Sequence, residues 1–517
     1  MTLRTVRAFG GMVAAGHPLA AAEGSAVLRD GGNAIDAAIA AAAVLSVVSP
    51  HECGLGGDLF AVIHDARGGI THALNASGRA PAAASVERYP DGIPSTGPMS
   101  VSVPGMVGGW AAAIERFGSR PLGGLLAAAI GHAEDGFPAY DVLIENTAEK
   151  AAAIAADVHC SAIFLPCGRP PREGARIRQP AAARTLRAIA AEGAAGFYGG
   201  PIARSMTDCL GSGGGLLTLE DLAGNRPSWE PVLEAPFHGH RVCTIPPNSW
   251  GAGLLAQLLL LEREGIAPPG DEAAFLLQGI RSRRTAYRML EGCIADPEVV
   301  GDRARRVLER LAAHGGPMHE AGVPPGTGAG GAAGTDTSNV IAVDRHGNAV
   351  SLLQSVFVPF GSAVLDPGSG VLMNNRMRGF GIRPDDPNCV GGRKRPAQTL
   401  TPALVLRGGE VVLACATPGG PGQTGTVAQF LARVLARGEA LADAIAAPRW
   451  SMTLSGDFIL EDSAPEPLRA AVTAAEPALK LARWGSVNIG SLAAIRRDGE
   501  GWCGCVDARR NAAVVGL

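Results

Sequence analysis

Residues 335–355 of the 517-residue chain read TDTSNVIAVDRHGNAVSLLQS. Residues 339–343 and 349–355 are rich in β-branched and apolar side chains, and the turn letters RHGN separate them, which predicts a β-hairpin. The preceding residues 321–336 read AGVPPGTGAGGAAGTD and cannot pack a core. We therefore expect an exposed, mobile loop there. Thr337 thus stands where a flexible loop meets a buried strand.

The position of Thr337 admits two interpretations. If the chain were cut before Thr337, this residue would carry a free α-amino group with a pKa of about 8 beside its hydroxyl. The amine could then serve as general base for the hydroxyl, so no histidine or aspartate partner would be needed. The alternative is a threonine that simply begins a strand, a common position for hydroxyl residues. The local pattern leaves both open and favours the second.

A second glycine-rich turn, residues 417–425 (TPGGPGQTG), lies between a predicted strand and a predicted helix. Backbone N–H groups at such a turn can hold an anion or an oxyanion. The letters GPGQTG also fit the GxGxxG pattern of dinucleotide-binding folds. However, no parallel βαβ unit precedes the turn, and a proline lies inside it. A plain glycine-rich turn is the third interpretation.

The first half of the chain is mainly helical and rich in alanine, and the second half is rich in strands. Helices are predicted at residues 19–30, 33–48, 107–134, 147–157, 180–194, 251–264, 426–437 and 439–446. Besides the hairpin, strands are predicted at residues 59–64, 241–245, 370–373, 403–406 and 411–416.

Composition excludes several classes of protein. Apolar residues make up 47% of the chain, which is ample for a buried core. A net charge of −3 gives no reason to expect nucleic acid or an anionic membrane as partner. The ten cysteines form no CxxC pair, and His238 and His240 lack a third ligand nearby, so no metal site is expected. Without a recognisable signal peptide or spanning segment, we expect a soluble cytoplasmic protein.

Ordered motifs run through nearly the whole chain. They include HPLAAAEGSAVLRDGGNAIDAA (17–38), HECGLGGDLFAVIHD (51–65), SVPGMVGGW (102–110), IPPNSWGAG (245–253), TSNVIAVD (337–344), MNNRM (373–377) and TPGGPGQ (417–423). Together they resemble the γ-glutamyltransferase family of N-terminal-nucleophile hydrolases. The resemblance implies an α+β fold, a four-layer αββα sandwich with an alanine-rich helical region. It also reverses the local preference at Thr337 in favour of a nucleophile.

Family members that this chain resembles are made as one precursor that cuts itself. The resemblance places the cut between Asp336 and Thr337. A large subunit, 1–336, would end in the flexible processing linker 321–336, and a small subunit, 337–517, would begin at the nucleophile.

The resemblance also implies the catalytic roles. Thr337 would attack an amide carbonyl, and its α-amine would move the proton. Ser355 would hydrogen-bond the nucleophile, and the N–H groups of Gly419 and Gly420 would hold the oxyanion. The acyl group would pass to water or to an amine. The expected partners are therefore a small-molecule amide and the two subunits of one precursor, as a homodimer of the processed heterodimer, with no cofactor.

The residues that would grip a glutamate donor depart from the family pattern. Ser77 stands where family members carry the arginine that binds the α-carboxylate, and Arg79 follows two residues later. Gln398 and Thr399 replace a pair of serines that helps to hold the same carboxylate. The resemblance therefore leaves open whether Arg79 can swing into the carboxylate position and preserve γ-glutamyl activity.

The positions that hold the α-amino group differ as well. Phe357, Arg376 and Gly379 stand where an asparagine, a glutamine or glutamate, and an aspartate are expected. An ammonium needs acceptors or anions nearby, whereas an arginine attracts a carboxylate. The sequence thus predicts a small acyl group that carries a carboxylate and lacks the α-amine. This resembles the family branch of oxamate amidohydrolase and the cephalosporin (glutaryl) acylases.

Two further alternatives stay open at this stage. One is an inactive scaffold that keeps the same fold, and the other is a nucleotide-binding α/β protein that uses residues 420–425.

Overall fold

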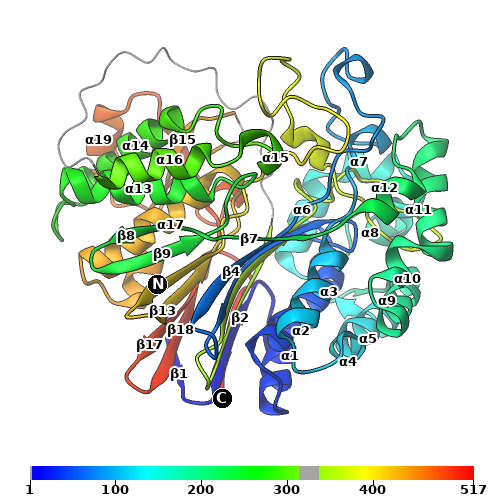
Figure 1. Cartoon of the computed structure of the whole chain (residues 1–517), viewed down its shortest axis with the longest axis horizontal. Coiled ribbons are helices and arrows are strands. Elements are labelled where there is room, and N and C mark those ends of the chain that lie inside the picture. The colour runs from blue at the N-terminus through cyan, green and yellow to red at the C-terminus, as the bar shows by residue number, and fades with distance from the viewer. Residues whose placement is uncertain (1–2, 314–336, 454) are drawn as a thin grey trace.

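The computed structural model describes residues 3–313, 337–453 and 455–517. Two seven-stranded antiparallel sheets form its centre (Figure 1). In spatial order, the first sheet comprises β1 (Val6–Ala8), β18 (Gly501–Val506), β17 (Ala493–Asp498), β13 (Glu410–Ala416), β12 (Ala403–Arg407), β9 (His240–Thr244) and β8 (Leu233–Phe237). The second comprises β19 (Ala513–Gly516), β2 (Gly11–Ala15), β10 (Ser338–Asp344), β11 (Ala349–Ser355), β3 (Asp58–Asp65), β4 (Ile70–Ala76) and β7 (Ser228–Glu230).

The two sheets pack face to face. Apolar side chains from both fill the space between them, among them Phe60, Ile341, Leu404 and Ile495. The Ser351 hydroxyl donates to the carbonyl of Cys415 at 2.9 Å and so links β11 to β13 across this layer. Alternate residues of each strand point the other way, into two separate helix-covered cores.

Helices cover both outer faces, which completes the expected αββα order (Figure 1). The second sheet carries α1 (Pro18–Arg29), α2 (Ala34–Val48), α3 (Met106–Phe117), α4 (Leu122–Leu125), α5 (Ala127–Asp135), α6 (Asp141–Glu149), α7 (Ala151–Ala155), α8 (Val158–Phe164), α9 (Pro180–Glu192), α10 (Ala195–Tyr198), α11 (Gly200–Ser212) and α12 (Leu219–Gly224). The first carries α13 (Gly251–Glu264), α14 (Glu272–Met289), α16 (Arg303–Ala313), α17 (Gln423–Leu431), α18 (Leu441–Ala446) and α19 (Glu466–Ala475). A short helix, α15 (Pro297–Val300), joins α14 to α16.

Two smaller sheets lie outside the sandwich. They comprise β14 (Trp450–Met452), β15 (Phe458–Glu461) and β16 (Lys480–Ala482) in one, and β5 (Phe137–Pro138) and β6 (Arg176–Ile177) in the other.

Helix α2 lies at the centre of its layer, and every one of its residues is buried. Its run of alanines lets α1 approach closely. At Gly24 of α1, a Cβ atom would lie 2.9 Å from the carbonyl oxygen of Ala37, so the contact needs glycine. Asn33 caps the start of α2 through a reciprocal capping box with Asp36.

Most predicted elements form as expected, and the errors have local causes. The helix predicted at 107–134 is divided into α3, α4 and α5, because Gly118 ends α3 and Pro121 precedes α4. The strand predicted at 370–373 is wrong, since these residues make only isolated bridges. After Leu431 the predicted helix 426–437 continues as a π-helical segment, Ala432–Ala436. The predicted loop 321–336 lies outside the described residues.

No helix in the described ranges combines the length and the apolar character that crossing a membrane requires.

His17 caps α1 and gives a first prediction. Its Nδ1 accepts the N–H of Leu19 at 3.2 Å, and burial, together with His51 and His132, lowers its pKa to about 4. Because the unfolded chain protonates near pH 6.5, we expect His17 to remove on the order of 3 kcal/mol of stability as the pH falls from 6.5 to 4. In denaturant unfolding, the free energy of unfolding of His17→Asn should fall less steeply as the pH is lowered. Asparagine keeps a side-chain acceptor for the helix cap. The control is His346→Asn at an exposed position, for which the free energy of unfolding should depend on pH as in the wild type.

Candidate active site

Thr337 lies at the start of β10, an interior strand of the second sheet. It immediately precedes β10, which pairs with β2 on one side and β11 on the other, and it is 2% exposed. Ser338 pairs with Gln354, so the same register continued by one residue sets Thr337 opposite Ser355. The two hydroxyl residues predicted from the sequence are thus brought to neighbouring positions. Asp336 lies outside the described residues.

The row across the sheet continues to an aspartate that the sequence analysis did not single out. Ser355 pairs with Asp58, the first residue of β3. The Asp58 side chain is fully buried, and its Oδ1 accepts the N–H of Gly78 at 2.7 Å. The only sequence signal was its place directly after residues 54–57 (GLGG) at the start of an apolar strand. Charged residues are rarely buried without a partner.

Arg376 is the partner of Asp58. Its Nε lies 3.1 Å from Asp58 Oδ2, both side chains are fully buried, and its guanidinium carbon lies 4.4 Å from the ring centroid of Phe357. Neither Nη1 nor Nη2 has a hydrogen-bond partner among the described residues. A buried guanidinium with two unpartnered amino groups has the donors that a carboxylate accepts from.

Phe357 is held in place by Ser355. Its N–H donates to Ser355 Oγ at 2.8 Å, and its φ of 93° lies in the left-handed region that large side chains avoid. Strained backbone of this kind is concentrated at functional sites.

Burial dominates the electrostatics of this pair. It raises the pKa of Asp58, against the lowering effect of the Arg376 charge, and it lowers the pKa of Arg376 to about 10. Arg376 therefore stays protonated at neutral pH and can hold an anion.

Gln398 belongs to the same cluster, whereas Ser77 and Thr399 have other contacts. Gln398 Nε2 donates to Asp58 Oδ2 at 2.9 Å. Ser77 Oγ donates to Asn75 Oδ1 at 2.8 Å and accepts from Asn248 Nδ2. Thr399 is buried, and its carbonyl accepts the hydroxyl of Thr401. The structure therefore places Gln398, but not the side chain of Ser77, against the Asp58–Arg376 pair.

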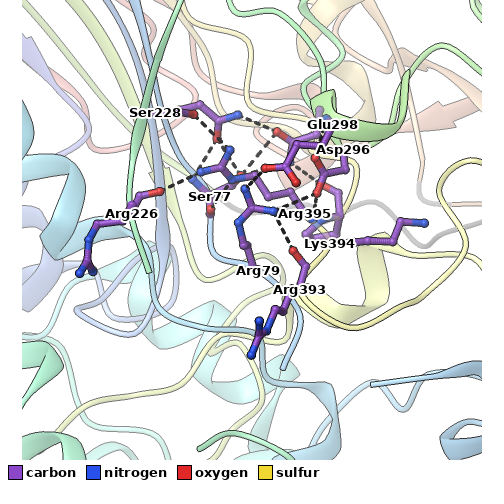
Figure 2. Close-up of polar contacts among 12 residues, drawn as sticks. Ser77, Arg79, Arg226, Ser228, Asp296, Glu298, Arg393, Lys394 and Arg395 are labelled. Carbon is purple, nitrogen blue, oxygen red and sulfur yellow. Dashed lines mark hydrogen bonds and ion pairs between the residues drawn. The ribbon is translucent and has the colours of Figure 1, made fainter. Parts of the chain in front are cut away.

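Arg79 is engaged elsewhere (Figure 2). Its guanidinium contacts Glu298 at 2.5 Å, Asp296 at 3.4 Å and the carbonyl of Arg393 at 2.8 Å. A substrate carboxylate that recruited Arg79 would first have to displace two protein carboxylates.

The candidate oxyanion turn lies at the end of β13, next to the start of β10. Asn339 Nδ2 donates to the carbonyl of Ala416 at 3.4 Å. Asn339 lies two residues after Thr337, and Ala416 lies three residues before Gly419, so this bond brings the two segments together. Gly419 has a φ of 114°, and a Cβ on it would lie 3.1 Å from the Cα of Gly490, so only glycine fits. β13 has antiparallel neighbours on both sides, which is not the parallel βαβ setting of a dinucleotide site.

The sequence matches the model of the gamma-glutamyltranspeptidase family over residues 20–517. The chain belongs to this family. This γ-glutamyltranspeptidase family member is 34% identical over 452 residues to the oxamate amidohydrolase proenzyme of Klebsiella pneumoniae subsp. pneumoniae, covering 85% of this chain and 84% of that one. It is 31% identical to an acylase ACY 1 proenzyme of Pseudomonas sp. (strain SE83), with 90% and 86% of the two chains covered.

Among solved structures, a cephalosporin acylase from Bacillus halodurans superposes with a TM-score of 0.91 at 30% identity, covering 99% of this chain and 97% of that chain. The likeness confirms the α+β N-terminal-nucleophile hydrolase fold, and the relatives are enzymes. The γ-glutamyltranspeptidase family member is therefore an enzyme and not a nucleotide-binding α/β protein.

Proposed function

We propose that the chain is a self-cleaving amidohydrolase or acyltransferase for small amides whose acyl group carries a carboxylate. The observation that carries this proposal is the buried Arg376, which has two unpartnered amino groups and sits beside the row Thr337–Ser355–Asp58. Relatives named as proenzymes of oxamate amidohydrolase and of an acylase support the same assignment.

Maturation would begin at the peptide bond between Asp336 and Thr337. The Thr337 hydroxyl attacks the carbonyl of Asp336, the C–N bond breaks, and an ester forms while the nitrogen becomes the α-amine of Thr337. Water then hydrolyses the ester. The products are residues 1–336 and 337–517, the second beginning with the free nucleophile.

In the mature enzyme, the α-amine of Thr337 takes the hydroxyl proton as the oxygen attacks the substrate amide carbonyl. The N–H groups of Gly419 and Gly420 stabilise the oxyanion. The amine then returns the proton to the leaving nitrogen, which departs as the C–N bond breaks. Water, or an amine acceptor, repeats the sequence on the threonyl ester and releases the acyl group.

The environment of Arg376 favours an acyl group without an α-ammonium. Phe357 and Gly379 offer no side-chain acceptor, and Asp58 is already used by Gly78, Gln398 and Arg376. A positive charge brought to this place would meet the Arg376 guanidinium with no free anion to balance it.

A γ-glutamyl donor is the second candidate, on the strength of the family itself. It would need Arg79 to leave Asp296 and Glu298, or Arg376 to take the α-carboxylate while the α-amine stays unpaired. We therefore rank it below oxamate-like and glutaryl amides.

The test is a panel of amides given to the processed protein. Oxamate, glutaryl anilide, γ-glutamyl anilide and glutathione are compared at equal concentration, with the methyl esters of oxamate and of the glutaryl anilide as the matched substrates without a carboxylate. We expect kcat/KM for the best carboxylate-bearing amide to exceed that of its uncharged match at least about a hundredfold, as a buried charge contact provides. Preference for γ-glutamyl anilide would favour the second candidate, and equal rates on the charged and uncharged pair would contradict both.

A further inference from the structure

Arg283, on α14, is a fully buried arginine that does not belong to the Asp58–Arg376 cluster. Its Nη2 donates to the carbonyl of Pro421 at 3.1 Å, inside the candidate oxyanion turn. Nε and Nη1 have no hydrogen-bond partner, and no carboxylate pairs with the guanidinium in the described part of the chain. Burying an unpaired charge lowers stability, so this placement calls for a reason beyond packing.

The hydrogen bond to Pro421 is the first link of a chain that ends at Gly420. The peptide group that contains the Pro421 carbonyl also contains the N–H of Gly422, which donates to the carbonyl of Gly419 at 3.0 Å. The peptide group that contains the Gly419 carbonyl also contains the N–H of Gly420. Each acceptor is thus joined through one peptide unit to the next donor, and linked hydrogen bonds polarise one another.

Aromatic side chains hold Arg283 against the turn. Its guanidinium stacks on the ring of Tyr287, which itself stacks on Trp250 with centroids 3.8 Å apart and planes within 1°. The Tyr287 hydroxyl lies 3.1 Å from Thr424 Oγ1, in the first turn of α17. The column Trp250–Tyr287–Arg283 therefore fixes the arginine relative to the same turn that its Nη2 contacts.

We propose that Arg283 is a positioning residue for catalysis, which orients and polarises the Gly420 N–H toward the oxyanion. This proposal rests on the oxyanion role of Gly419 and Gly420 given above. Burial lowers the pKa of the Arg283 guanidinium, but an arginine side chain keeps its proton in proteins. The positive charge behind the turn strengthens the donor through the two peptide units and favours negative charge on the substrate oxygen. Since that charge exists only in the tetrahedral species, Arg283 acts on the transition state and not on the planar substrate.

The test separates affinity for a tetrahedral anion from affinity for a planar ligand. A carboxylate-bearing boronic acid forms an anionic tetrahedral adduct with a nucleophilic hydroxyl, whereas the product carboxylic acid stays planar. In Arg283→Met, we expect the boronate Ki to rise and kcat to fall by about tenfold, less than the loss of a whole oxyanion donor, with KM and the product Ki unchanged. The matched control is Arg284→Met, because Arg284 is an exposed neighbour that pairs with Glu476 and does not contact the turn.

Equal changes in boronate and product affinity would mean that Arg283 only supports the fold, and an unchanged boronate Ki would mean that it does not act on the oxyanion. Either result overturns the proposal. If Arg283→Met does not fold or is not cleaved, Arg283→Gln is tested by the same comparison of the boronate Ki with the product Ki. We expect the boronate Ki of this variant to rise about threefold because the charge is missing, with the product Ki unchanged. Failure of the proposed function looks different, because the boronate would then not inhibit the wild-type enzyme at all.

Discussion

Thr337→Ala is expected to remain one uncut chain without amidase activity. Alanine lacks the hydroxyl that would attack both the Asp336 carbonyl and the substrate, so both reactions should stop together. The loss of activity should be at least about a thousandfold, as for other covalent nucleophiles. Denaturing gel electrophoresis checks the first effect, since the wild-type protein should give two bands, and the amide panel checks the second.

Two further variants sharpen this result. Thr337→Ser keeps a hydroxyl and an α-amine and should still cut itself and turn over substrate, more slowly. Ser355→Ala should keep the nucleophile but lose its neighbour across the strand pair, and should give a smaller loss than Thr337→Ala. A fully active Thr337→Ala, or a wild-type chain that stays uncut while active, would contradict the proposed nucleophile.

Arg376→Gln should remove the preference for carboxylate-bearing amides. We expect kcat/KM for the best such substrate to fall by about a hundredfold or more, because the substrate carboxylate loses a buried cation. The rate on the matched uncharged amide should change little. Comparing the two substrates in the same variant separates recognition of the carboxylate from general damage to the site.

The variant also leaves the Asp58 carboxylate buried without its cation, which is destabilising in itself. The double variant Asp58→Asn/Arg376→Gln removes both charges and should recover stability in thermal unfolding without recovering the substrate preference. Arg378→Gln, two residues along the same turn, is the control and should keep the wild-type preference. If Arg376→Gln still prefers the charged amide, the substrate carboxylate must bind at another residue, and Arg79 is the next candidate.

Local signals in the sequence were sufficient for much of the fold. The helix predicted at 251–264 and the strand at 349–355 form with the predicted bounds, because periodicity and flanking turn residues agree there. The approach of Thr337 to Ser355 also follows from local chemistry, since one tight turn sets the register of the hairpin that joins them.

The charged contacts of Arg376 and Arg79 could not be predicted in the same way. Asp58 and Arg376 are separated by more than 300 residues, and nothing in either segment indicates that the other neutralises it. The ion pairs that hold Arg79 arise in the same way, from Asp296 at the start of the distant helix α15 and Glu298 within that helix. Which charged residues meet depends on how the layers pack, so the sequence indicated the residue types but not their partners.

Both sheets contain strands from before and after Thr337, and this affects the stability of the enzyme after the proposed cut. Residues before and after Thr337 meet at five strand–strand junctions, β1 with β18, β12 with β9, β19 with β2, β2 with β10, and β11 with β3. An uncut chain that unfolds can regain these pairings in a unimolecular reaction. Once the chain is cut, refolding becomes a bimolecular encounter between two fragments that each lack strands of both sheets. The native enzyme would then last because it unfolds slowly, and each molecule would have, in effect, a single opportunity to fold.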